Sequence, residues 1–332
     1  MTGQKIVFTA PRTAELQEYT LPELRDKEVL VRTEYTVVSG GTERANLLAL
    51  PNTSQHFPIT LGYCGVGNVV KTGCAVQSVK PGDRVLVYHG IHSNYNIRGI
   101  DEITKVEDDS VSSLDAAFVI IASMGLGGVR KLALEIGESA MVMGLGLLGM
   151  FAVQFCHLNG AYPVIAADLN PERRALALQL GADYALDPSC PDFTETVKRI
   201  TGGKGVNGCV EVTGSSAAIH QALDCAAWMG RIALLGCTRV SDSSIDYYSQ
   251  VHKPGIQLIG AHNFVRPKTE SYPHHWTHQD DCQAILRLIG AGRIKVSPIC
   301  SRVVDPAECG EIYTQLCENP LFPIGTVFHW KG

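Results

Sequence analysis

The sequence contains no hydrophobic run long enough to cross a membrane and no excess of positive charge. No stretch of about eighteen consecutive apolar residues occurs, so a membrane partner is not expected. The first residues, "MTGQKIVFTAPRTAEL", lack the basic head, apolar segment and small-residue cleavage site of an export signal. We therefore expect a cytoplasmic protein.

Charged residues are few and slightly acidic in balance, at 18% of the chain with a formal net charge of −5. No basic face is evident, which argues against a nucleic-acid partner. The eleven cysteines are odd in number and scattered, and Cys156, Cys209 and Cys237 lie within apolar runs. These features favour buried, reduced thiols over disulfides.

The chain has 332 residues, of which 45% are hydrophobic, and this is enough for two domains with full cores. Up to about residue 112, short β-branched segments such as "EVLVRTEYTVVS" and "DRVLVYHG" alternate with glycines. This pattern predicts an irregular, partly open β-barrel. From about residue 115, apolar strands alternate with helices, which predicts an α/β Rossmann domain with a doubly wound parallel sheet.

Some predicted elements have definite bounds. We expect a helix over 217–230, a strand over 231–236, a last sheet strand over 256–262, and a helix beginning near 280. The stretch "YPHHWTHQDD", residues 272–281, is interpreted as an exposed polar connector. Asp280 and Asp281 are expected to cap the helix that follows it.

A glycine-rich turn predicts the nucleotide site. Gly144, Gly146 and Gly149 follow a predicted strand, and Leu147 and Leu148 open a predicted helix. The first glycine permits a tight turn, the second a close approach to a pyrophosphate, and the third helix–strand packing. The helix N-terminus then faces the phosphates with unpaired N–H groups.

Further residues are expected at the same cofactor. Asp168 ends the next strand, where an acid accepts hydrogen bonds from ribose hydroxyls and repels a 2′-phosphate, so NAD(H) is favoured over NADP(H). Arg173 and Arg174 weaken the preference for NAD(H), because an arginine near this point can bind the 2′-phosphate of NADP(H). Thr213 and the pair Gly236-Cys237 close later strands, at the sheet edge where ligands bind.

An earlier glycine cluster, "LGYCGVGNVVKTG", does not lie between a predicted strand and a predicted helix. Gly62, Gly65 and Gly67 are followed by a strand-like segment and not by a helix, so no helix dipole is available to a phosphate. We interpret these glycines as positions of close backbone packing or of strand bulges.

The order of domains and the motifs "VKPGDRVLVY", "VMGLGLLGMFAVQ", "ERRALALQLGAD", "VEVTG" and "GRIALLG" resemble the medium-chain dehydrogenase/reductase superfamily. The stretches "SGGTE" and "GYCGVG" resemble its zinc-type relatives around bacteriochlorophyllide dehydrogenase. The resemblance implies a GroES-like catalytic domain over 1–117 and 263–332, and a Rossmann domain over 118–262. It also implies a homodimer or homotetramer, paired through the strand near 257–260.

The sequence departs from this family at its metal sites. Many members bind a catalytic zinc through a cysteine, a histidine and a third cysteine or glutamate; the matching positions here are Gly40, Tyr63 and about Ile120. The segment after the Gly-Asp-Arg-Val turn, "YHGIHSNYNI", also lacks the four cysteines of the structural zinc. We therefore expect no zinc.

Without a metal, a side chain must protonate or stabilise the developing alkoxide. Tyr63 is the first candidate, although it would need a lowered pKa to act as a base. His89, or His92, is the candidate proton relay, Glu43 is the candidate to orient Tyr63 or His89, and Ser39 is a candidate donor to substrate. An alternative is a different metal site formed by Glu43, Cys64 and His89.

The leading hypothesis is a zinc-independent oxidoreductase that moves a hydride between NAD(H) and a small secondary alcohol or ketone. A sugar, a polyol or a secondary metabolite is a suitable substrate. One alternative is reduction of a polarised C=C bond, as in quinone and enoyl reductases. Another is a nucleotide-binding regulator without turnover.

Overall fold

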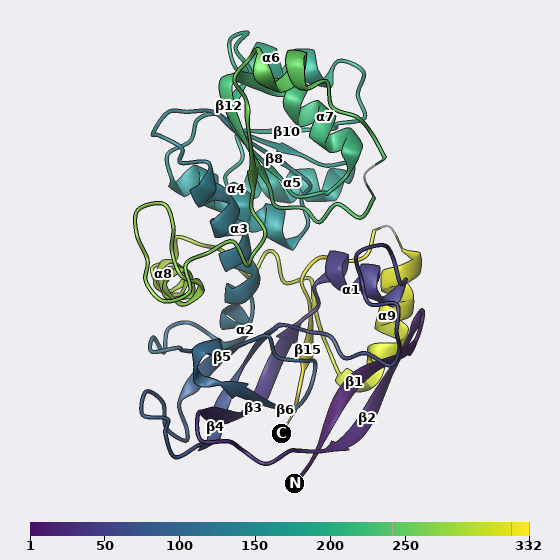
Figure 1. Cartoon of the computed structure of the whole chain (residues 1–332), viewed down its shortest axis with the longest axis vertical. Helices are drawn as coiled ribbons and strands as arrows, with labels where there is room; N and C mark the ends of the chain where they lie inside the picture. Colours follow the sequence, from purple (N-terminus) through teal and green to yellow (C-terminus); the bar gives the residue numbers. More distant parts are fainter. Residues whose placement is uncertain (241, 320, 332) are drawn as a thin grey trace. The chain divides into compact units, whose positions relative to one another are not determined.

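The computed structural model describes residues 1–240, 242–319 and 321–331 and divides into two compact units (Figure 1). Unit 1 comprises 1–121 together with the described residues of 282–331, and unit 2 comprises 122–281. The expected boundaries were 117/118 and 262/263. The units divide instead at 121/122 and 281/282, and the larger difference is at the second boundary, because residues 263–281 pack within unit 2. No helix in the described part is long and apolar enough to span a membrane.

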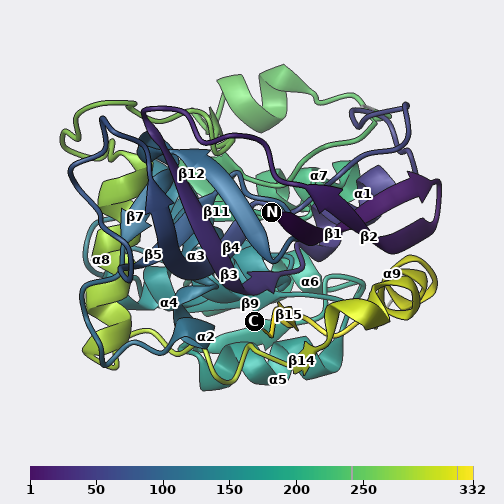
Figure 2. The same cartoon turned by 90° about the horizontal axis from the view of Figure 1, so that it is seen from below.

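Unit 1 is built on one twisted sheet with the strand order β14-β15-β3-β4-β5-β7, and β6 also pairs with β3 (Figure 2). Its strands are β3 (Glu28–Val37), β4 (Cys64–Thr72), β5 (Arg84–Tyr88), β6 (Tyr95–Gly99), β7 (Ile103–Lys105), β14 (Arg302–Val304) and β15 (Thr326–His329). The hairpin of β1 (Thr2–Ala10) and β2 (Thr13–Thr20) forms a separate two-stranded sheet, and β1 is bridged to Ile59 and Ser93. This β-rich arrangement agrees with the expected open barrel.

Unit 1 also contains helices. They are α1 (Gly40–Leu47), α2 (Ser113–Ala116) and α9 (Cys309–Glu318), with the 3-10 turns η1 (Ile100–Glu102) and η3 (Pro306–Glu308). The core under α9 joins Phe8 of β1, Tyr313 of α9 and Phe328 of β15, all of them fully buried. Side chains from both ends of the sequence therefore form one core.

The earlier glycine cluster lies in the unit 1 sheet, as the sequence predicts. A Cβ on Gly67 would stand 2.2 Å from the carbonyl oxygen of Arg32, and the β3–β4 register shifts between Thr33 and Tyr35. Gly67 thus permits close backbone approach beside a bulge. No phosphate loop forms there, since β4 runs through the cluster.

Unit 2 contains a parallel sheet with the order β10-β9-β8-β11-β12-β13, the arrangement of a doubly wound Rossmann fold. The strands are β8 (Ala140–Met143), β9 (Val164–Ala167), β10 (Tyr184–Leu186), β11 (Val206–Glu211), β12 (Ala226–Leu234) and β13 (Gln257–Gly260). The helices are α4 (Leu147–Leu158), α5 (Pro171–Gln179), α6 (Phe193–Ile200) and α7 (Ser216–Cys225), with the π-helix η2 (Tyr247–His252). Helices α3 (Val119–Lys131) and α8 (His278–Gly290) include the unit boundaries.

The helix expected over 217–230 ends earlier than predicted. Helix α7 stops at Cys225, and Ala226 already pairs with Val206 in the parallel β11–β12 ladder. The run "CAAWMG" favours helix by its alanines, but strand pairing and the burial of Ala227 override that propensity. All eleven cysteines are free, as expected, although Cys237 is exposed and not buried.

The connector over 272–281 is not simply an exposed segment. Helix α8 begins at His278, and the Thr277 hydroxyl accepts the backbone N–H of Asp280. Asp281 is 1% exposed and binds Arg130 and Arg266, so it is no helix cap. A buried carboxylate must be paired, and these two arginines tie the connector into unit 2.

Candidate active site

The glycine turn of unit 2 has the geometry that the sequence predicts. Gly144 adopts a φ of +92°, and Gly146 is the N-cap of α4, with Leu147 and Leu148 in its first turn. A Cβ on Gly149 would lie 1.9 Å from the carbonyl oxygen of Gly144, whereas one on Gly146 would meet nothing within 4 Å. The space beside Gly146 and the helix N-terminus together suit a pyrophosphate.

The acid at the end of β9 supports this loop directly. The Asp168 carboxylate accepts the backbone N–H of Leu145 at 2.7 Å and that of Asn170 at 2.8 Å. Arg173 lies in the first turn of α5, where its backbone N–H is bound by the Asn170 side chain. The neighbouring Arg174 is held by Asp187 and by the carbonyl of Asp168. Asp168 is therefore placed beside the glycine turn, and Arg174 is already engaged.

At the carboxyl ends of the strands, Thr213 contacts Gly144 of the glycine turn, and Gly236 and Cys237 contact Gly214, the residue after Thr213. Cβ atoms built on Gly144 and Gly236 would lie 2.7 Å from the Thr213 methyl and 2.3 Å from the Gly214 nitrogen. The buried Glu211 fixes the turn at Thr213 and Gly214, because its carboxylate accepts the backbone N–H of both residues. Sequence reasoning overlooked Glu211, although an acid at the end of an otherwise apolar strand is a signal in itself.

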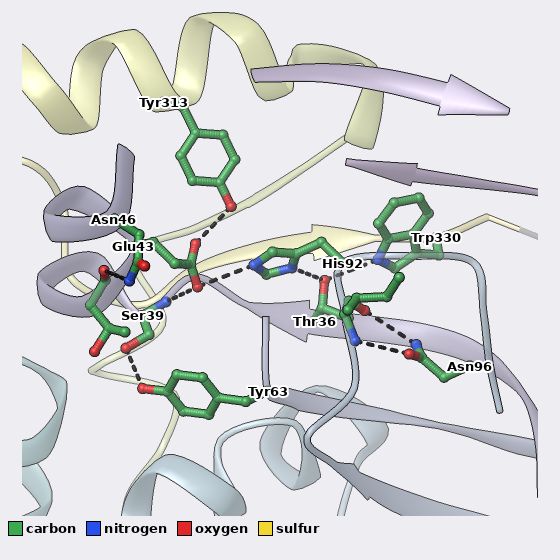
Figure 3. A network of polar contacts seen from close by, with 11 residues as sticks. Thr36, Ser39, Glu43, Asn46, Tyr63, His92, Asn96, Tyr313 and Trp330 are labelled. Atoms are coloured by element: carbon green, nitrogen blue, oxygen red, sulfur yellow. Dashed lines mark hydrogen bonds and ion pairs between the residues drawn. The ribbon is translucent and has the colours of Figure 1, made fainter. Parts of the chain in front are cut away.

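In unit 1, Ser39 and Tyr63 share a hydrogen bond between their hydroxyl groups, in which either can donate (Figure 3). Ser39 is the N-cap residue of α1, but its side chain makes no capping bond. Its hydroxyl points instead to Tyr63, which precedes β4. The structure thus joins two of the predicted catalytic residues.

Glu43 lies beside this pair and is 1% exposed. Its carboxylate accepts three hydrogen bonds, from Ser39 N–H at 2.8 Å, His92 Nε2 at 3.2 Å and the Tyr313 hydroxyl at 2.7 Å. Figure 3 shows the three donors converging from different elements. Such donors satisfy a buried carboxylate, and the Ser39 contact fixes the backbone that carries the hydroxyl.

His92 extends the network into the sheet. Its Nδ1 lies 2.7 Å from Thr36 Oγ1, and that oxygen accepts Trp330 Nε1–H at 3.0 Å. Because Thr36 accepts from Trp330, its own proton is available to His92 Nδ1, which leaves the Nε2–H for Glu43. Glu43 is thus linked to both ends of the unit 1 sequence.

His89 is paired with a different carboxylate from the expected Glu43. His89 Nδ1 lies 2.9 Å from Glu102 Oε1 and its ring stacks on Tyr88. The hydrogen bonds described for Glu43 come from Ser39, His92 and Tyr313. His92 takes the place beside Glu43, because the backbone N–H of His92 binds Leu61 in the segment leading to Tyr63. Glu43, Cys64 and His89 are not assembled, and no three His, Cys, Asp or Glu side chains in the described chain form a metal site.

The residues at the family's zinc positions do not fit a zinc ion. Gly40 begins α1 and has no side chain, and Ile120 is a fully buried aliphatic residue. Tyr63, at the histidine position, directs its hydroxyl to Ser39. The neighbouring Cys64 is buried, and burial raises the pKa of its thiol well above the ordinary value. We derive no step through a metal.

Burial holds both tyrosines of the network in the neutral, protonated form. Burial, and then the nearby Cys64, raises the pKa of Tyr63, while the bond from Ser39 opposes the rise. Burial and the Glu43 charge raise the pKa of Tyr313 well above its usual range. A raised pKa keeps a phenol neutral at physiological pH, so Tyr63 lacks the lowered pKa that a general base needs.

Sequence reasoning missed Tyr313, Thr36 and Trp330 as partners of the site. Tyr313 and Glu43 are separated by 270 positions. Tyr313 falls within an amphipathic helix and Trp330 follows the last strand, so each has an ordinary place in a core. No local signal in the sequence identifies them.

Comparisons with known proteins agree with this geometry. Residues 25–134 match the model of the alcohol dehydrogenase GroES-like domain, and residues 148–290 match that of the zinc-binding dehydrogenase. The two matches fall largely on unit 1 and on unit 2 respectively. The finer resemblance, to the relatives around bacteriochlorophyllide dehydrogenase, stays a prediction.

Full-length relatives are also similar. D-guloside 3-dehydrogenase of Escherichia coli is 25% identical over 95% of this chain and 96% of its own. L-threonine 3-dehydrogenase of Pyrococcus furiosus is 26% identical over 86% of each chain. The fold matches that of benzyl alcohol dehydrogenase from Acinetobacter calcoaceticus, with a TM-score of 0.85, 18% identity and full coverage of both chains. This chain belongs to the medium-chain dehydrogenase/reductase superfamily and is an oxidoreductase of that type.

Proposed function

We propose that the protein transfers a hydride between NAD(H) and the carbon of a secondary alcohol or ketone, and that protein hydroxyl groups polarise the oxygen in place of zinc. The observation that carries the proposal is the hydroxyl pair of Ser39 and Tyr63, because Tyr63 stands at the position that the family resemblance assigns to a zinc-binding histidine. A sugar or polyol is the proposed substrate class, since similar proteins include a D-guloside 3-dehydrogenase and a sorbitol dehydrogenase.

The nicotinamide ring, when bound, supplies or accepts the hydride at carbon. Gly146 leaves room for the pyrophosphate, and Asp168 supports a preference for NAD(H), because its charge opposes a 2′-phosphate. Thr213 and Gly236 supply further contacts at the same strand ends. Arg174 is held by Asp187, which leaves it less available to a 2′-phosphate.

Tyr63 provides the proton. In ketone reduction, its hydroxyl donates to the carbonyl oxygen as negative charge develops there. Burial makes a tyrosinate costly, so Ser39 passes its proton to Tyr63 through their hydrogen bond while its own hydroxyl takes up a proton from solvent. Glu43 acts as a positioning residue, because it binds the Ser39 N–H and not the substrate.

The decisive experiment pairs substrate screening with a deuterium label. The purified protein is assayed with NADH and a panel of ketoses and cyclic ketones, and the product made from 4-deuterated NADH is read by NMR. Deuterium on the carbinol carbon supports the proposal, whereas deuterium on the carbon β to a carbonyl indicates C=C reduction. Binding of NADH with no transfer across the panel indicates a regulator.

A variant separates the hydroxyl mechanism from a metal mechanism. Tyr63→Phe is expected to lower kcat about 10²- to 10⁴-fold, the usual range for a general acid, while NADH affinity stays the same. Tyr35→Phe, on β3 of the same sheet, is the control. Stoichiometric zinc, with activity lost on its removal and restored by its return, would refute the proposal.

We also infer a homo-oligomer. Strand β13 ends the sheet order of unit 2, and an edge strand presents unpaired backbone groups that pairing with a second copy would satisfy. Light scattering of the purified protein is expected to give the mass of a dimer or tetramer. Leu258→Pro, which removes one backbone donor of β13, is expected to weaken the assembly, and a monomeric parent protein would contradict this inference.

A further inference from the structure

A pocket in unit 2 is lined by more positive than negative charge. Its lining includes Arg130, Lys131 and Arg266 as permanent cations, with Asp281 as the single carboxylate. The space free of atoms is about 320 Å³, part of it open to solvent. This pocket belongs neither to the glycine turn nor to the Ser39–Tyr63 pair.

Asp281 holds two of the cations in fixed positions. It is 1% exposed, and its two oxygens bind Arg130 Nε at 2.7 Å and Arg266 Nη1 at 2.8 Å. Arg266 Nη2 donates to the Ser123 carbonyl, and Arg266 lies so close to α3 that a Cβ on Gly127 would stand 2.6 Å from it. One carboxylate neutralises one of these two guanidinium groups and leaves the other charge uncompensated.

Arg130 keeps donors available. Its guanidinium lies 3.9 Å from the ring centre of Trp276, and only its Nε binds Asp281. Among the described residues, no hydrogen-bond partner is found for its two terminal nitrogens, Nη1 and Nη2. Neither nitrogen is among the buried polar atoms that lack a partner, so both are open to solvent. Trp276 and Asp281 thus orient a guanidinium whose free edge remains accessible to a ligand.

Lys131 adds a charge without a partner. It is half-buried, and the part of the chain that the structure describes supplies it with no ion pair. Burial, and then the Arg266 charge, lowers the pKa of its ammonium group, as expected where positive charge is not compensated. The carbonyl end of α3 contributes a partial charge of only about −0.5, which does not cancel an excess of two.

We propose that this pocket binds a small oxyanion, of the size and charge of phosphate, between Lys131 and the free edge of Arg130. The pocket reaches Ala261 and His262, which follow β13, and strand β13 is three places from β8 in the sheet. The site is therefore separate from the pyrophosphate site beside β8. The oxyanion is either a free ion or an acidic group carried by the substrate, and only the second case rests on the proposed function.

Calorimetry with inorganic phosphate tests the site on the whole protein. The titration is made in saturating NAD⁺, so that the pyrophosphate site is occupied. Lys131→Met is expected to weaken phosphate binding about tenfold, the usual effect of one charge-assisted hydrogen bond. Lys204→Met, which removes an exposed lysine of the same unit, is expected to leave the affinity unchanged.

The outcomes are distinct. The proposal is supported if the parent protein binds phosphate and this binding is weakened by Lys131→Met but not by Lys204→Met. The proposal is overturned if the parent protein does not bind phosphate, or if saturating NAD⁺ abolishes the binding. It is also overturned if both variants weaken phosphate binding equally. Because Lys131 makes no ion pair, thermal unfolding of Lys131→Met is expected to match the parent, and Lys131→Gln is a second variant if it does not.

A kinetic arm identifies the source of the oxyanion. If the substrate carries it, phosphate inhibits competitively, and Lys131→Met raises KM for a ketose phosphate but not for the free ketose. If the ion binds by itself, phosphate binding persists without competition. The two proposals can fail separately. If the protein is inactive but binds phosphate, and Lys131→Met weakens that binding, the proposed function is refuted and the oxyanion site is supported.

Discussion

The Tyr313 hydroxyl donates to Oε2 of Glu43 at 2.7 Å, and so connects helix α9 to helix α1 across 270 positions of sequence. Glu43 in turn accepts the backbone N–H of Ser39, whose hydroxyl binds Tyr63. The position of the proposed proton donor therefore depends on a helix that follows the entire nucleotide domain in the sequence.

Removing the Tyr313 hydroxyl is expected to destabilise the protein and disturb the site. Tyr313→Phe leaves one oxygen of a buried carboxylate without its donor, which costs about 1–3 kcal/mol of unfolding free energy. Urea unfolding measures this loss, with Tyr35→Phe as the control, since no hydrogen-bond partner is described for the Tyr35 hydroxyl. Equal stability of Tyr313→Phe and the parent protein would show that the bond contributes nothing.

The pH profile of ketone reduction is expected to remain flat to high pH. Tyr63 donates as a neutral phenol, and burial raises its pKa above the ordinary value of about 10. A tyrosine with an ordinary pKa would be half ionised at pH 10, whereas this one remains protonated and kcat is retained. Steady-state assays with NADH, with circular dichroism at each pH, measure the effect. A decline near pH 6.5 would instead indicate a histidine donor.

Two glycines of the nucleotide turn are expected to respond differently to alanine. Gly149→Ala places a methyl group 1.9 Å from the Gly144 carbonyl oxygen, so both thermal stability and NADH binding are expected to fall. Gly146→Ala meets no protein atom within 4 Å at a φ of −72°, so the melting temperature is unchanged. Its methyl group occupies the proposed pyrophosphate space, and fluorescence titration is expected to show weaker NADH binding. Normal NADH affinity in Gly146→Ala would place the cofactor elsewhere.

The charge of Asp168 is expected to determine the choice of cofactor. Asp168→Asn retains an oxygen for the Leu145 N–H but removes the charge that repels a 2′-phosphate. The ratio of kcat/KM for NADPH to that for NADH is expected to rise about tenfold, equivalent to about 1.4 kcal/mol. Asp183→Asn is a matched control, because Asp183 accepts the backbone N–H of Val164 in the same way. An unchanged ratio in Asp168→Asn would contradict this role.

The sequence predicted what short-range patterns determine. Glycine spacing identified the turn at Gly144 because one strand and one helix fix its geometry, and alternating apolar segments predicted the parallel sheet. The pairing of His92 with Glu43 was not predictable, since it depends on where a loop crosses the sheet. The burial of Asp281 depends on arginines from two other segments, so the local pattern suggested a helix cap instead.

The closing of the unit 1 sheet has a consequence for synthesis on the ribosome. Strand β15 pairs with β3, and Trp330 donates to Thr36, so the first 121 residues emerge long before the residues that complete their core. Unit 2 is continuous in sequence and can fold while the chain is still growing. The nascent protein is thus expected to acquire its nucleotide fold first, and its proton-donating network only after residues 302–330 have been made.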